Sequence, residues 1–518
     1  MIGRRMIPEH PSVPDTIGPR NPCDAARLPC GAARRVLVVG GGVAGLSAAL
    51  ELAERGYRVT LKEAAAVLGG RLHTRDERLR TGTFRVEHGL HMWFWQYYNF
   101  FDIIRRLGRE RCFRPLEEVY YEFKAYRPEV VRSVGPYPFN VINVVRESPN
   151  LSLLDVAGAR GALGDMIRYD HDLNHRRFDD ETFEAWGRRA RVSRRFWDIV
   201  MAPVASVTLN DPARVSAAEM LLYMHLFFLG HPRAFRRLVA TVDHGTALID
   251  PWVARLCSLG ATVEVSAPVA GLLLEAGRAV GEVGSPARHD AVVLASDVGG
   301  LHRILAGTVA CDAASAAALA ALRARLRRLA VAPPYHVLRG WFDRPIRRRP
   351  VEAVIETPQH RPINLIAIFS MLEEQSAAWA RERGGSVVEL HLYNTPELGG
   401  LAADVVHESI RGQVEQILPE LRGARALDLS LGAFQNFTSL EVGQGKSRPT
   451  SDAAILAGIP NLALAGDWVH TRYPSALMER AVSTGREAAN HILFADRVRE
   501  VPLSAARKRG PGVLPRFG

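Results

Sequence analysis

The chain has 518 residues, of which 47% are hydrophobic and 23% charged, a globular composition with enough length for about two to four domains. Its five cysteines are scattered without a C-x-x-C pair, which argues against a disulfide framework or a metal site and favours a reducing cytoplasm. The formal net charge of +11 suits anionic partners such as phosphate-bearing cofactors or acidic lipid. No nucleic-acid-binding motif is present, so we expect no nucleic-acid partner.

The two ends of the chain differ in composition from the rest. Residues 1–33 are rich in proline and lack the continuous apolar stretch of a signal peptide, so we expect a flexible leader. Residues 496–518 are expected to form a basic tail. No apolar run reaches the roughly 18 residues that a membrane-spanning helix needs. The longest, Met220–Gly230, predicts a buried helix, with a surface that dips into a membrane as the alternative.

A strand–helix–strand pattern occupies residues 34–63. "RVLVV" is a continuous β-branched run typical of a buried parallel strand, and "VAGLSAALELAERG" has the apolar spacing of a helix. "YRVTLKE" then predicts a second strand, which ends in an acidic residue. Strand, turn, helix, strand and terminal acid follow one another in the register of a dinucleotide-binding unit.

Each part of this unit has a physical role in binding a dinucleotide. The first glycine permits the tight turn, the second the close approach of a pyrophosphate, and the third the close packing of helix on strand. The helix N-terminus offers free N–H groups to phosphates, and the acid can accept hydrogen bonds from an adenosine ribose. The predicted binding residues here are Gly40, Gly42, Val43, Ala44, Gly45 and Glu63.

The next segment, "AAAVLGGRLHT", places Gly69, Gly70 and Arg71 shortly after the acid. This acid-then-G-G-R pattern resembles the FAD-binding family of amine oxidases and carotenoid desaturases. The resemblance implies that the arginine and the glycine backbone lie along the diphosphate and flavin of FAD. It also implies an α/β fold, with a Rossmann-like FAD domain of the glutathione-reductase type and a second, mixed α+β substrate domain.

Seven of the fifteen residues from Glu87 to Phe101 are aromatic. "HMWFWQYYNFFDIIRRLG" predicts a helix closed by Gly108, and its polar side is not especially cationic, which disfavours a membrane anchor. Core packing is expected for most of the rings. In the resembling family this part of the chain passes from the flavin towards the substrate domain. Candidate substrate-lining residues are therefore Trp93, Trp95 and Tyr97, and the residues expected first at the cavity are Trp95 and His91.

The middle of the chain alternates between the two predicted domains. "GTALIDPWVARLCSLGATVEVSAPVAGLLLEAGRAVGEV" predicts helix, strand and hairpin, and "HDAVVLASD" a strand that returns to the sheet. The resemblance implies that this segment closes the FAD domain, with backbone near Val269 at the adenine. The predicted FAD domain comprises residues 34–110, 241–311 and 426–495, and the substrate domain residues 111–240 and 312–425.

Within the substrate domain, "PARVSAAEMLLYMHLFFLG" predicts one apolar helix, and "YHVLRGWFDRPI" and "SVVELHLYN" predict strands. These segments are similar to bacterial carotenoid desaturases of the branch that converts β-ring into aromatic-ring carotenoids. The "GLH" of residues 89–91 is similar instead to the phytoene and ζ-carotene desaturases. The resemblance therefore implies an apolar isoprenoid or carotenoid substrate without naming it.

A second cofactor motif lies near the end of the chain. In "IPNLALAGDWVHTRYPSALMERAVSTGREAANHIL" a strand leads to Gly466 and Asp467, and a helix starts at about Ser475. The resemblance implies that the aspartate bonds the flavin ribityl chain. It also implies that the helix N-terminus faces the pyrimidine edge of the flavin, where it would stabilise negative charge. The residues at this N-terminus are Leu477, Met478 and Glu479.

No paired-carboxylate, Ser-His-Asp or metal-ligand pattern indicates hydrolysis. Desaturation of a C–C bond needs little from the protein beyond position and a dry cavity, because flavin accepts the hydride. The resemblance places four candidate catalytic residues near the flavin: His91, His470, Arg472 and Tyr473. Their alternative roles are hydrogen bonding to backbone, packing or contact with the cofactor. Amine oxidases of the family carry an aromatic residue of the substrate cage where this chain has Leu477. This difference weakens the interpretation of the chain as an amine oxidase.

The expected chemistry is therefore hydride transfer from an apolar substrate to non-covalent FAD, since no cysteine lies near "AGDWVH". The electron acceptor is expected to be quinone or oxygen. The alternatives are an amine or other small-molecule oxidase and a non-redox isomerase or dehydroxylase of the same fold. The expected location is the cytoplasm, and the alternative is a cytoplasmic protein that contacts a membrane peripherally.

Overall fold

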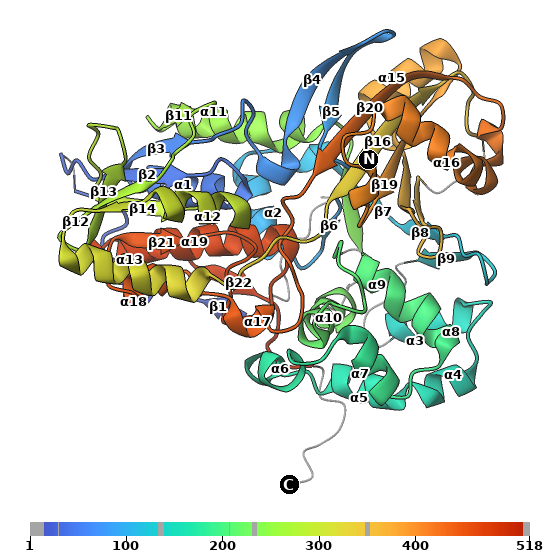
Figure 1. The fold of residues 1–518 in the computed structure, drawn as a ribbon, viewed down its shortest axis with the longest axis horizontal. Coiled ribbons are helices and arrows are strands. Elements are labelled where there is room, and N and C mark those ends of the chain that lie inside the picture. Colours follow the sequence, from blue (N-terminus) through green and yellow to red (C-terminus); the bar gives the residue numbers. More distant parts are fainter. Residues whose placement is uncertain are drawn as a thin grey trace, which may run out of the picture.

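The computed structural model describes residues 15–29, 31–132, 139–206, 208–229, 236–347 and 353–510. Figure 1 shows a parallel sheet on the left, a mixed sheet at the upper right and a group of short helices at the lower right. The predicted α/β class, with a Rossmann-like sheet and a second mixed sheet, is confirmed.

The parallel sheet has five strands in the order β11-β3-β2-β14-β21. Three separate parts of the chain supply them, and every neighbouring pair is parallel. The predicted strand–helix–strand unit provides the centre of this sheet. In sheet order the strands are Thr262–Glu264, Arg58–Lys62, Arg35–Val39, Ala291–Leu294 and Leu462–Leu464.

Strand β2 shows how the two faces of this sheet are covered. Val36 and Val38 belong to one buried cluster, which includes α1, α11 and α19, whereas Leu37 and Val39 belong to another, which includes α12, α13 and α18. Alternate residues of a strand point to opposite faces, so the continuous apolar run "RVLVV" is explained by two helical layers. The helices are Val43–Glu54 (α1), Asp250–Ser258 (α11), Val298–Gly307 (α12), Ala313–Leu326 (α13), Ala453–Leu456 (α18) and Leu477–Ala495 (α19).

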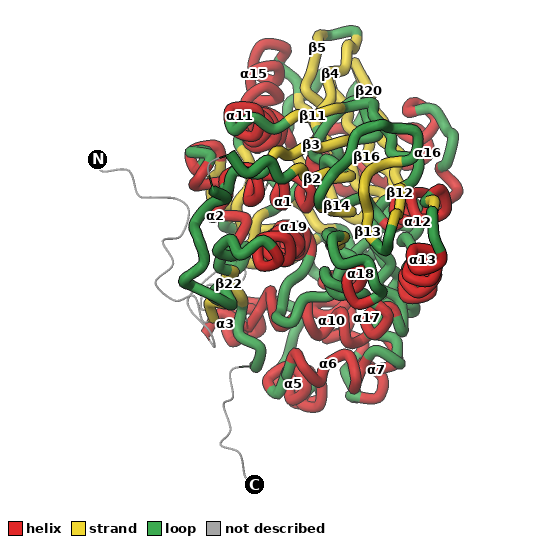
Figure 2. Tube along the Cα trace, turned by 90° about the vertical axis from the view of Figure 1, so that its left-hand side faces the viewer, coloured by secondary structure: helices red, strands yellow, loops and turns green. Residues whose placement is uncertain are grey.

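Helices α1 and α19, from the two cofactor motifs, pack directly on each other, and Figure 2 shows α19 below α1 and the parallel sheet. A Cβ at Gly485 would lie 2.3 Å from the Ala44 carbonyl oxygen, so only glycine permits this close approach. The Ser47 hydroxyl also donates to the Val482 carbonyl across the interface, at 3.0 Å. The small residues of α19 therefore hold the chain's two cofactor motifs together.

The mixed sheet has seven strands in the order β20-β16-β19-β18-β17-β8-β9. All its pairs are antiparallel except β17 with β8. Helix α16 covers one face, and the other face turns towards the parallel sheet. In sheet order the strands are Ala426–Phe434, Tyr335–Phe342, Ser386–Leu392, Ile363–Ile368, Val354–Glu356, Glu118–Tyr121 and Glu129–Arg132; the helices at this sheet are Phe369–Leu372 (α14), Glu374–Arg383 (α15) and Ala403–Ile417 (α16).

Smaller sheets and short helices complete the described part of the chain. Sheets β6-β10-β7, β13-β12-β15 and β4-β5 comprise Trp93–Phe94 (β6), Arg237–Ala240 (β10), Phe113–Leu116 (β7), Arg278–Glu282 (β13), Leu272–Glu275 (β12), Val309–Ala310 (β15), Thr74–Leu79 (β4) and Gly82–Glu87 (β5). The remaining α-helices are Tyr98–Arg106 (α2), Phe139–Glu147 (α3), Leu153–Gly158 (α4), Arg160–Ile167 (α5), His171–Phe178 (α6), Phe183–Arg189 (α7), Arg194–Phe196 (α8), Ala202–Ser206 (α9), Ala217–Met224 (α10) and Gln444–Ser447 (α17).

The predicted apolar helix of the substrate domain is α10, extended by a π-helical turn, His225–Leu229. The Ser216 hydroxyl caps its start by accepting from the Ala218 N–H. The apolar residues from Met220 to Phe228 are buried, so the buried-helix interpretation is confirmed and the membrane-dipping alternative is wrong for them. Gly230 lies outside the described residues.

The helix predicted over the aromatic run is only partly correct. Trp93–Phe94 is strand β6, which pairs with β10, and helix α2 begins at Tyr98 and ends at Arg106 before Gly108. Pairing with a distant strand overrides the helical spacing of the first rings. The helix starts where it does because Glu479 accepts the backbone N–H groups of Asn99 and Phe100, at 2.9 and 3.0 Å.

The described parts of the predicted leader and tail are packed on the protein, contrary to expectation. Asp15–Ile17 (β1) pairs with Leu503–Ala505 (β22), and Arg20 donates to Glu500 from its backbone N–H at 2.6 Å. The Lys508 carbonyl accepts from His171 of α6. Strand pairing supplies the contacts that local composition does not show. Residues 1–14 and 511–518 lie outside the described residues.

Two predicted domain boundaries also differ from the packing. Strand β20, placed by prediction in the FAD domain, pairs with β16 of the mixed sheet. Helix α13, placed in the substrate domain, shares a buried cluster with Leu37 and Leu294 of the parallel sheet. Each element belongs to the domain whose sheet buries its apolar face. A short-range sequence pattern does not specify which sheet that is.

Candidate functional site

The strand–turn–helix at the carboxyl end of strand β2 has the geometry predicted for its glycines. Gly40 has a φ of +111°, and a Cβ there would lie 2.6 Å from the Ala295 carbonyl oxygen. A Cβ at Gly45 would lie 1.9 Å from the Gly40 carbonyl oxygen, so this glycine serves packing and does not line the cavity. A Cβ at Gly42 would meet only Gly70 Cα, at an ordinary contact distance of 3.8 Å. Gly42 lines the cavity together with Val43 and Ala44, so the space in front of the N-terminus of α1 is open.

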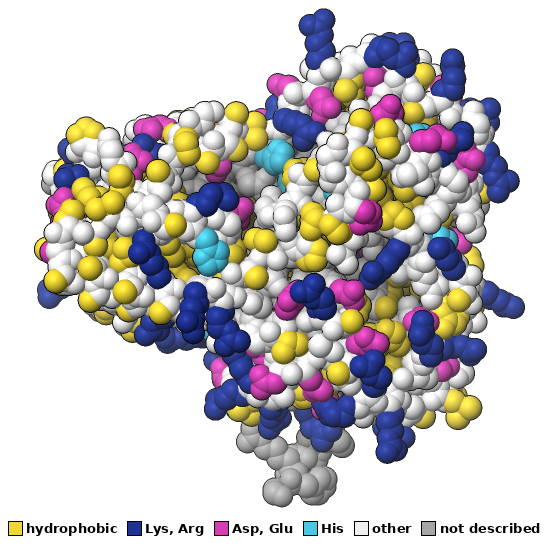
Figure 3. Space-filling model, in the orientation of Figure 1, with side chains coloured by type: hydrophobic (Ala, Val, Ile, Leu, Met, Phe, Trp, Pro, Cys, Tyr) yellow, Lys and Arg dark blue, Asp and Glu magenta, His cyan; other side chains and the backbone are white. Residues whose placement is uncertain are grey.

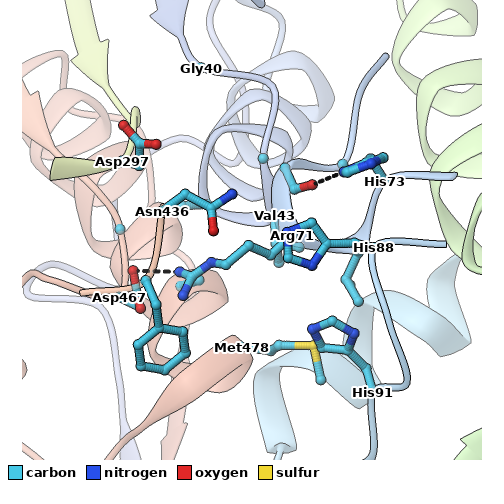
Figure 4. A pocket seen from close by; sticks show the side chains of 18 of the residues that line it. Gly40, Val43, Arg71, His73, His88, His91, Asp297, Asn436, Asp467 and Met478 are labelled. Carbon is cyan, nitrogen blue, oxygen red and sulfur yellow. Dashed lines mark hydrogen bonds and ion pairs between the residues drawn. The ribbon is translucent and has the colours of Figure 1, made fainter. Parts of the chain in front are cut away.

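This open space belongs to a cavity of about 660 Å³ that runs between the two sheets. Figure 3 shows a recess between the two lobes with histidine at its edge. In Figure 4, Gly40 and Asp297 lie towards one end, and Met478 and His91 towards the other. The predicted cofactor residues that line the cavity are Gly40, Gly42, Val43, Ala44, Glu63, Gly69, Gly70, Arg71, Val269, Gly466, Asp467, Leu477 and Met478.

The predicted ribose acid is held in place by the backbone around it. Oxygens of Glu63 accept from the Gly41 N–H at 2.7 Å and from the Ala65 N–H at 2.8 Å. Each carboxylate oxygen has a second lone pair, which remains available to a ligand. The carboxylate is thus oriented at the cavity wall next to the glycine turn.

The front and back motifs meet through an ion pair at the cavity. Arg71 Nη2 lies 2.7 Å from Asp467 Oδ1, and Figure 4 shows the arginine crossing the cavity wall towards the aspartate. The guanidinium also lies over the ring of Phe437, 4.9 Å from its centroid. Gly69 and Gly70 before the arginine both have positive φ, so glycine permits the turn that aims it.

At the back motif, the first helical residue is strained. Leu477 has a φ of +53°, a conformation that costs a leucine about 1–2 kcal/mol, and it lines the cavity together with Met478. Such outliers persist where the surroundings enforce them, commonly at ligand sites. Glu479 instead turns away from the cavity and caps α2, so its predicted cofactor contact disagrees with its position.

Polar groups that the sequence does not single out lie at the nucleotide end of the same cavity. Ser296 follows strand β14, and its buried hydroxyl has no hydrogen-bond partner among the described residues. The neighbouring Asp297 caps α12 by accepting from the Gly300 N–H at 2.6 Å. Both side chains follow the strand predicted to return to the sheet. A buried hydroxyl without a partner indicates space for a polar ligand group.

The opposite wall of the cavity is the inner face of the mixed sheet. Its lining residues alternate along each strand, as the period of a β-strand requires. They come from β16, β17, β18 and the end of β19, and they are Tyr335, Val337, Glu356, Leu365, His391 and Tyr393. The polar residues at every second place of "ELHLYN" inside a buried strand are the signal that could have found them, because buried strands rarely carry such a pattern.

Comparison with known proteins agrees with this architecture. The family model described as flavin containing amine oxidoreductase matches residues 43–493. The chain belongs to this family. Among curated proteins, it is 32% identical to a carotenoid phi-ring synthase of Streptomyces griseus, over 91% of this chain and 90% of that protein. It is 27% identical to a carotenoid phi-ring synthase of Chlorobaculum tepidum, over 96% and 94% of the two chains.

Solved structures share the fold at lower identity. Putrescine oxidase bound to putrescine matches with a TM-score of 0.63 at 14% identity, over 89% of this chain and 99% of that one. An oxidoreductase from Methanosarcina mazei matches with a TM-score of 0.57 at 14% identity, over 88% and 99%. These likenesses show the fold alone. No helix within the described residues has the length and apolar character to cross a membrane.

Of the four predicted catalytic residues of this family member, His91 alone lines the cavity. Its Nδ1 lies 2.8 Å from the Gly89 carbonyl oxygen, and burial lowers the pKa of its imidazole to about 4. The ring is therefore neutral and weakly basic near pH 7. His91 therefore lies at the cavity as predicted, but its low basicity argues against a catalytic role as a proton acceptor.

The other three lie away from the cavity, contrary to prediction. His470 stacks on His171 with ring centroids 5.9 Å apart. Arg472 is exposed at the surface. Tyr473 is buried in a small cluster with Leu503 and Ala505 of the C-terminal segment. The segment after Asp467 leaves the cavity at this point because it turns to meet the chain end before re-entering as α19.

The aromatic run divides in the same way. Trp93 is fully buried beside Phe113, with ring centroids 4.9 Å apart, and does not line the cavity. Trp95 is buried beneath the guanidinium of Arg236 and also lies away from the cavity. Tyr97 does line it, as predicted. Phe94, which the sequence analysis did not select, lines it too.

Proposed function

We propose that the protein is an FAD-dependent oxidoreductase that desaturates C–C bonds of a carotenoid-like substrate. The observation that carries the proposal is one cavity with two unlike walls. One end has the glycine turn, the helix N-terminus and Glu63 of a dinucleotide site. The other end is lined largely by apolar and aromatic side chains, including Phe94, Tyr97 and Leu365.

The residues present fit FAD. Gly42 leaves backbone N–H groups of α1 open to phosphates, Glu63 is oriented for a ribose, and Ser296 offers a hydroxyl without a partner. Arg71 and Asp467 are placed to contact the middle of the cofactor. Among the described cysteines none lines the cavity, which supports non-covalent binding.

When bound, FAD would supply a hydride acceptor for a substrate carbon, while a proton leaves the neighbouring carbon. The chain's own contribution is to hold the substrate and to keep water out. Burial of the wall formed by Val337, Leu365 and Tyr97 supplies a dry surface for an apolar chain or ring. The ion pair of Arg71 with Asp467 fixes the polar side of the site.

The substrate class comes from the relatives and from the shape of the site. The carotenoid phi-ring synthases match nearly the whole chain, and we propose that this chain likewise acts on an end ring of a carotenoid. Leu477 stands where amine oxidases place a cage aromatic, so recognition of an amine is disfavoured. A small apolar wall beside the cofactor suits a ring with methyl groups.

We further propose a cytoplasmic protein that contacts a membrane peripherally to take up this substrate. Leu153 and Leu154 at the start of α4 are 85% and 83% exposed. In the adjacent helix α8, the Arg194 side chain is 86% exposed although it pairs with Asp198 at 2.9 Å, and the neighbouring Arg195 is also exposed. Exposed leucines beside a cation suit an anionic lipid surface. Replacing both leucines by glutamate should reduce sedimentation with anionic vesicles, and unchanged sedimentation would contradict the contact.

The test of the activity is anaerobic mixing of FAD-loaded protein with carotenoids that carry β-rings, with amines as controls, while the flavin absorbance is followed. The proposal expects bleaching by a carotenoid and a product with additional double bonds. Bleaching by amines alone would favour the small-molecule oxidase. A changed carotenoid without net bleaching would favour the non-redox isomerase. Reoxidation by quinone compared with oxygen identifies the electron acceptor.

A further inference from the structure

One row of the mixed sheet crosses the cavity wall. Glu356 of β17 is paired with Leu365 of β18, Leu365 with His391 of β19, and His391 with Val337 of β16. All four side chains line the cavity. Partners in register point to the same face, so a carboxylate and an imidazole flank an apolar strip. The proposed function so far uses neither group.

His391 is joined to a tyrosine that also lines the cavity. The hydroxyl of Tyr393 lies 3.0 Å from His391 Nδ1, and His391 Nε2 lies 2.8 Å from Glu389 Oε1. A carboxylate accepts hydrogen bonds, so Nε2 carries the hydrogen on that side. The Leu90 N–H also lies 3.3 Å from Nε2, but its shorter hydrogen bond, at 2.7 Å, goes to Glu389 Oε1. Nδ1 is then free to accept from the tyrosine hydroxyl.

The carboxylate behind the imidazole is fixed and charged. Glu389 is fully buried, and Arg339 donates to its Oε2 from Nε at 2.9 Å and from Nη2 at 2.6 Å. The Leu90 N–H donates to its Oε1 at 2.7 Å. Burial opposes ionisation, but Arg339 and His391 outweigh it and hold the pKa of Glu389 at about 2. A buried, charged carboxylate in this position holds the imidazole in one orientation through the hydrogen bond to Nε2.

We propose that Tyr393 and His391 form a proton relay at the cavity wall, with Glu389 as the positioning residue that holds the imidazole. The inference rests on the proposed desaturation. One C–H bond breaks and its electron pair leaves as hydride to the oxidised flavin. The neighbouring C–H bond breaks, its electrons form the C=C bond, and its proton passes to the Tyr393 oxygen. Tyr393 transfers its own proton to His391 Nδ1 and stays neutral.

Four other groups that line the cavity could accept the proton: His73, His88, His91 and Glu356. Burial lowers the pKa of both His73 and His88, which makes them poor bases. His91 is held by the Gly89 carbonyl, and its low pKa makes it a poor base. Glu356 lies two strands from His391, about 10 Å between Cα atoms at the usual strand spacing. No described residue orients its carboxylate by a hydrogen bond in the way that Glu389 orients His391. Glu356 is therefore the competing base to be tested.

The experiment compares Tyr393→Phe with Glu356→Gln and with Tyr121→Phe, a control on β8 that does not line the cavity. Anaerobic rapid mixing of FAD-loaded protein with a carotenoid measures flavin bleaching. Tyr393→Phe should slow bleaching by about 100-fold or more, the usual contribution of a general base. FAD absorbance and carotenoid affinity should stay within about twofold, and Tyr121→Phe should match the wild type. Bleaching at the wild-type rate in Tyr393→Phe, or loss only in Glu356→Gln, would overturn the relay.

A second measurement separates failure of the relay from failure of the proposed function. If no carotenoid bleaches the wild-type flavin, the proposed function fails. The relay contact is still judged from nitrogen-15 spectra of labelled histidine, with the His391 signal identified by its loss in His391→Asn. Tyr393→Phe should shift that signal, and an unshifted signal would refute the contact.

The role of Glu389 is tested by Glu389→Gln, which keeps the size of the side chain. A positioning role predicts that kcat falls by about 10- to 100-fold while KM for the carotenoid is unchanged. A purely structural role predicts instead a lower melting temperature with kcat retained in the folded fraction, and that outcome would remove Glu389 from the relay.

Discussion

The two walls of the cavity are built by different means. The nucleotide wall consists of short motifs in which neighbouring residues do the work, such as Gly40, Gly42 and Gly45 at one turn. The substrate wall consists of single residues from four strands that meet only in the folded sheet, such as Glu356 and His391. The nucleotide wall can be predicted from the sequence because its residues are neighbours in the chain. The substrate wall cannot, because its residues become neighbours only through the register of the strands.

The energetics of the two walls differ as well. At the nucleotide wall, glycines are required because backbone atoms leave no space for a Cβ or because φ is positive. Behind the substrate wall, charge is buried and compensated, as in the pair of Arg339 with Glu389. Changes at the first wall should therefore act on cofactor binding or folding, and changes at the second on rate or stability.

The largest effect on cofactor binding is expected from Gly42→Val at the nucleotide wall. A valine side chain would occupy the open space in front of the α1 N-terminus, where the pyrophosphate is proposed to lie. FAD affinity should fall by about 100-fold or more, equivalent to roughly 3 kcal/mol, while the melting temperature of the cofactor-free protein changes little. Fluorescence titration with FAD measures the first quantity and thermal unfolding the second.

Gly45→Ala is the matched control for that comparison. Its Cβ would lie 1.9 Å from the Gly40 carbonyl oxygen, so the helix must move and the protein should be destabilised even without cofactor. If Gly42→Val also lowered the melting temperature of the cofactor-free protein, or left FAD affinity intact, the assignment of the open space to the pyrophosphate would be wrong.

The next prediction compares an aromatic residue of the core, Trp93, with one that lines the cavity, Tyr97. Trp93→Ala removes a fully buried ring and should cost roughly 3–5 kcal/mol of unfolding free energy. Tyr97→Phe removes only a hydroxyl at the cavity and should change stability by less than about 1 kcal/mol. Denaturant unfolding measures both values. Similar losses in the two variants would contradict the distinction between core and cavity positions.

Much of the fold could be predicted because its signals are local. The strand–turn–helix at residues 35–54, the hairpin of β12 and β13 and the buried helix α10 follow from spacing and turn residues. The short strand β6 could not be predicted, because its partner β10 is more than a hundred residues away. Asp467 lies at the cavity, as the resemblance implies, but His470 does not. Only three positions separate them in the sequence, but the chain turns away from the cavity between them, and sequence spacing does not reveal such a turn.

The smallest effect concerns Glu479, which joins the cofactor helix α19 to α2 at the edge of the cavity. Burial raises its pKa to about 7, although N–H groups of Asn99 and Phe100 favour the ionised form. The folded protein then holds a proton that the unfolded chain releases near pH 4.5. Its contribution to stability is present below that pH and is lost as the pH rises towards 7.

Glu479→Gln removes this titration, so the unfolding free energy of the wild type should fall relative to the variant between pH 5 and 7.5. The full shift corresponds to about 3 kcal/mol at most. Buried histidines such as His91 titrate with the opposite sign, losing stability as pH falls from 6.5 towards 4, but they are common to both proteins and cancel in the difference. Denaturant unfolding across this pH range measures the difference. If the difference in unfolding free energy between the two proteins stayed constant with pH, the N–H groups of Asn99 and Phe100 would keep Glu479 ionised. Glu479 would then be a compensated buried charge, like Glu389 behind the substrate wall.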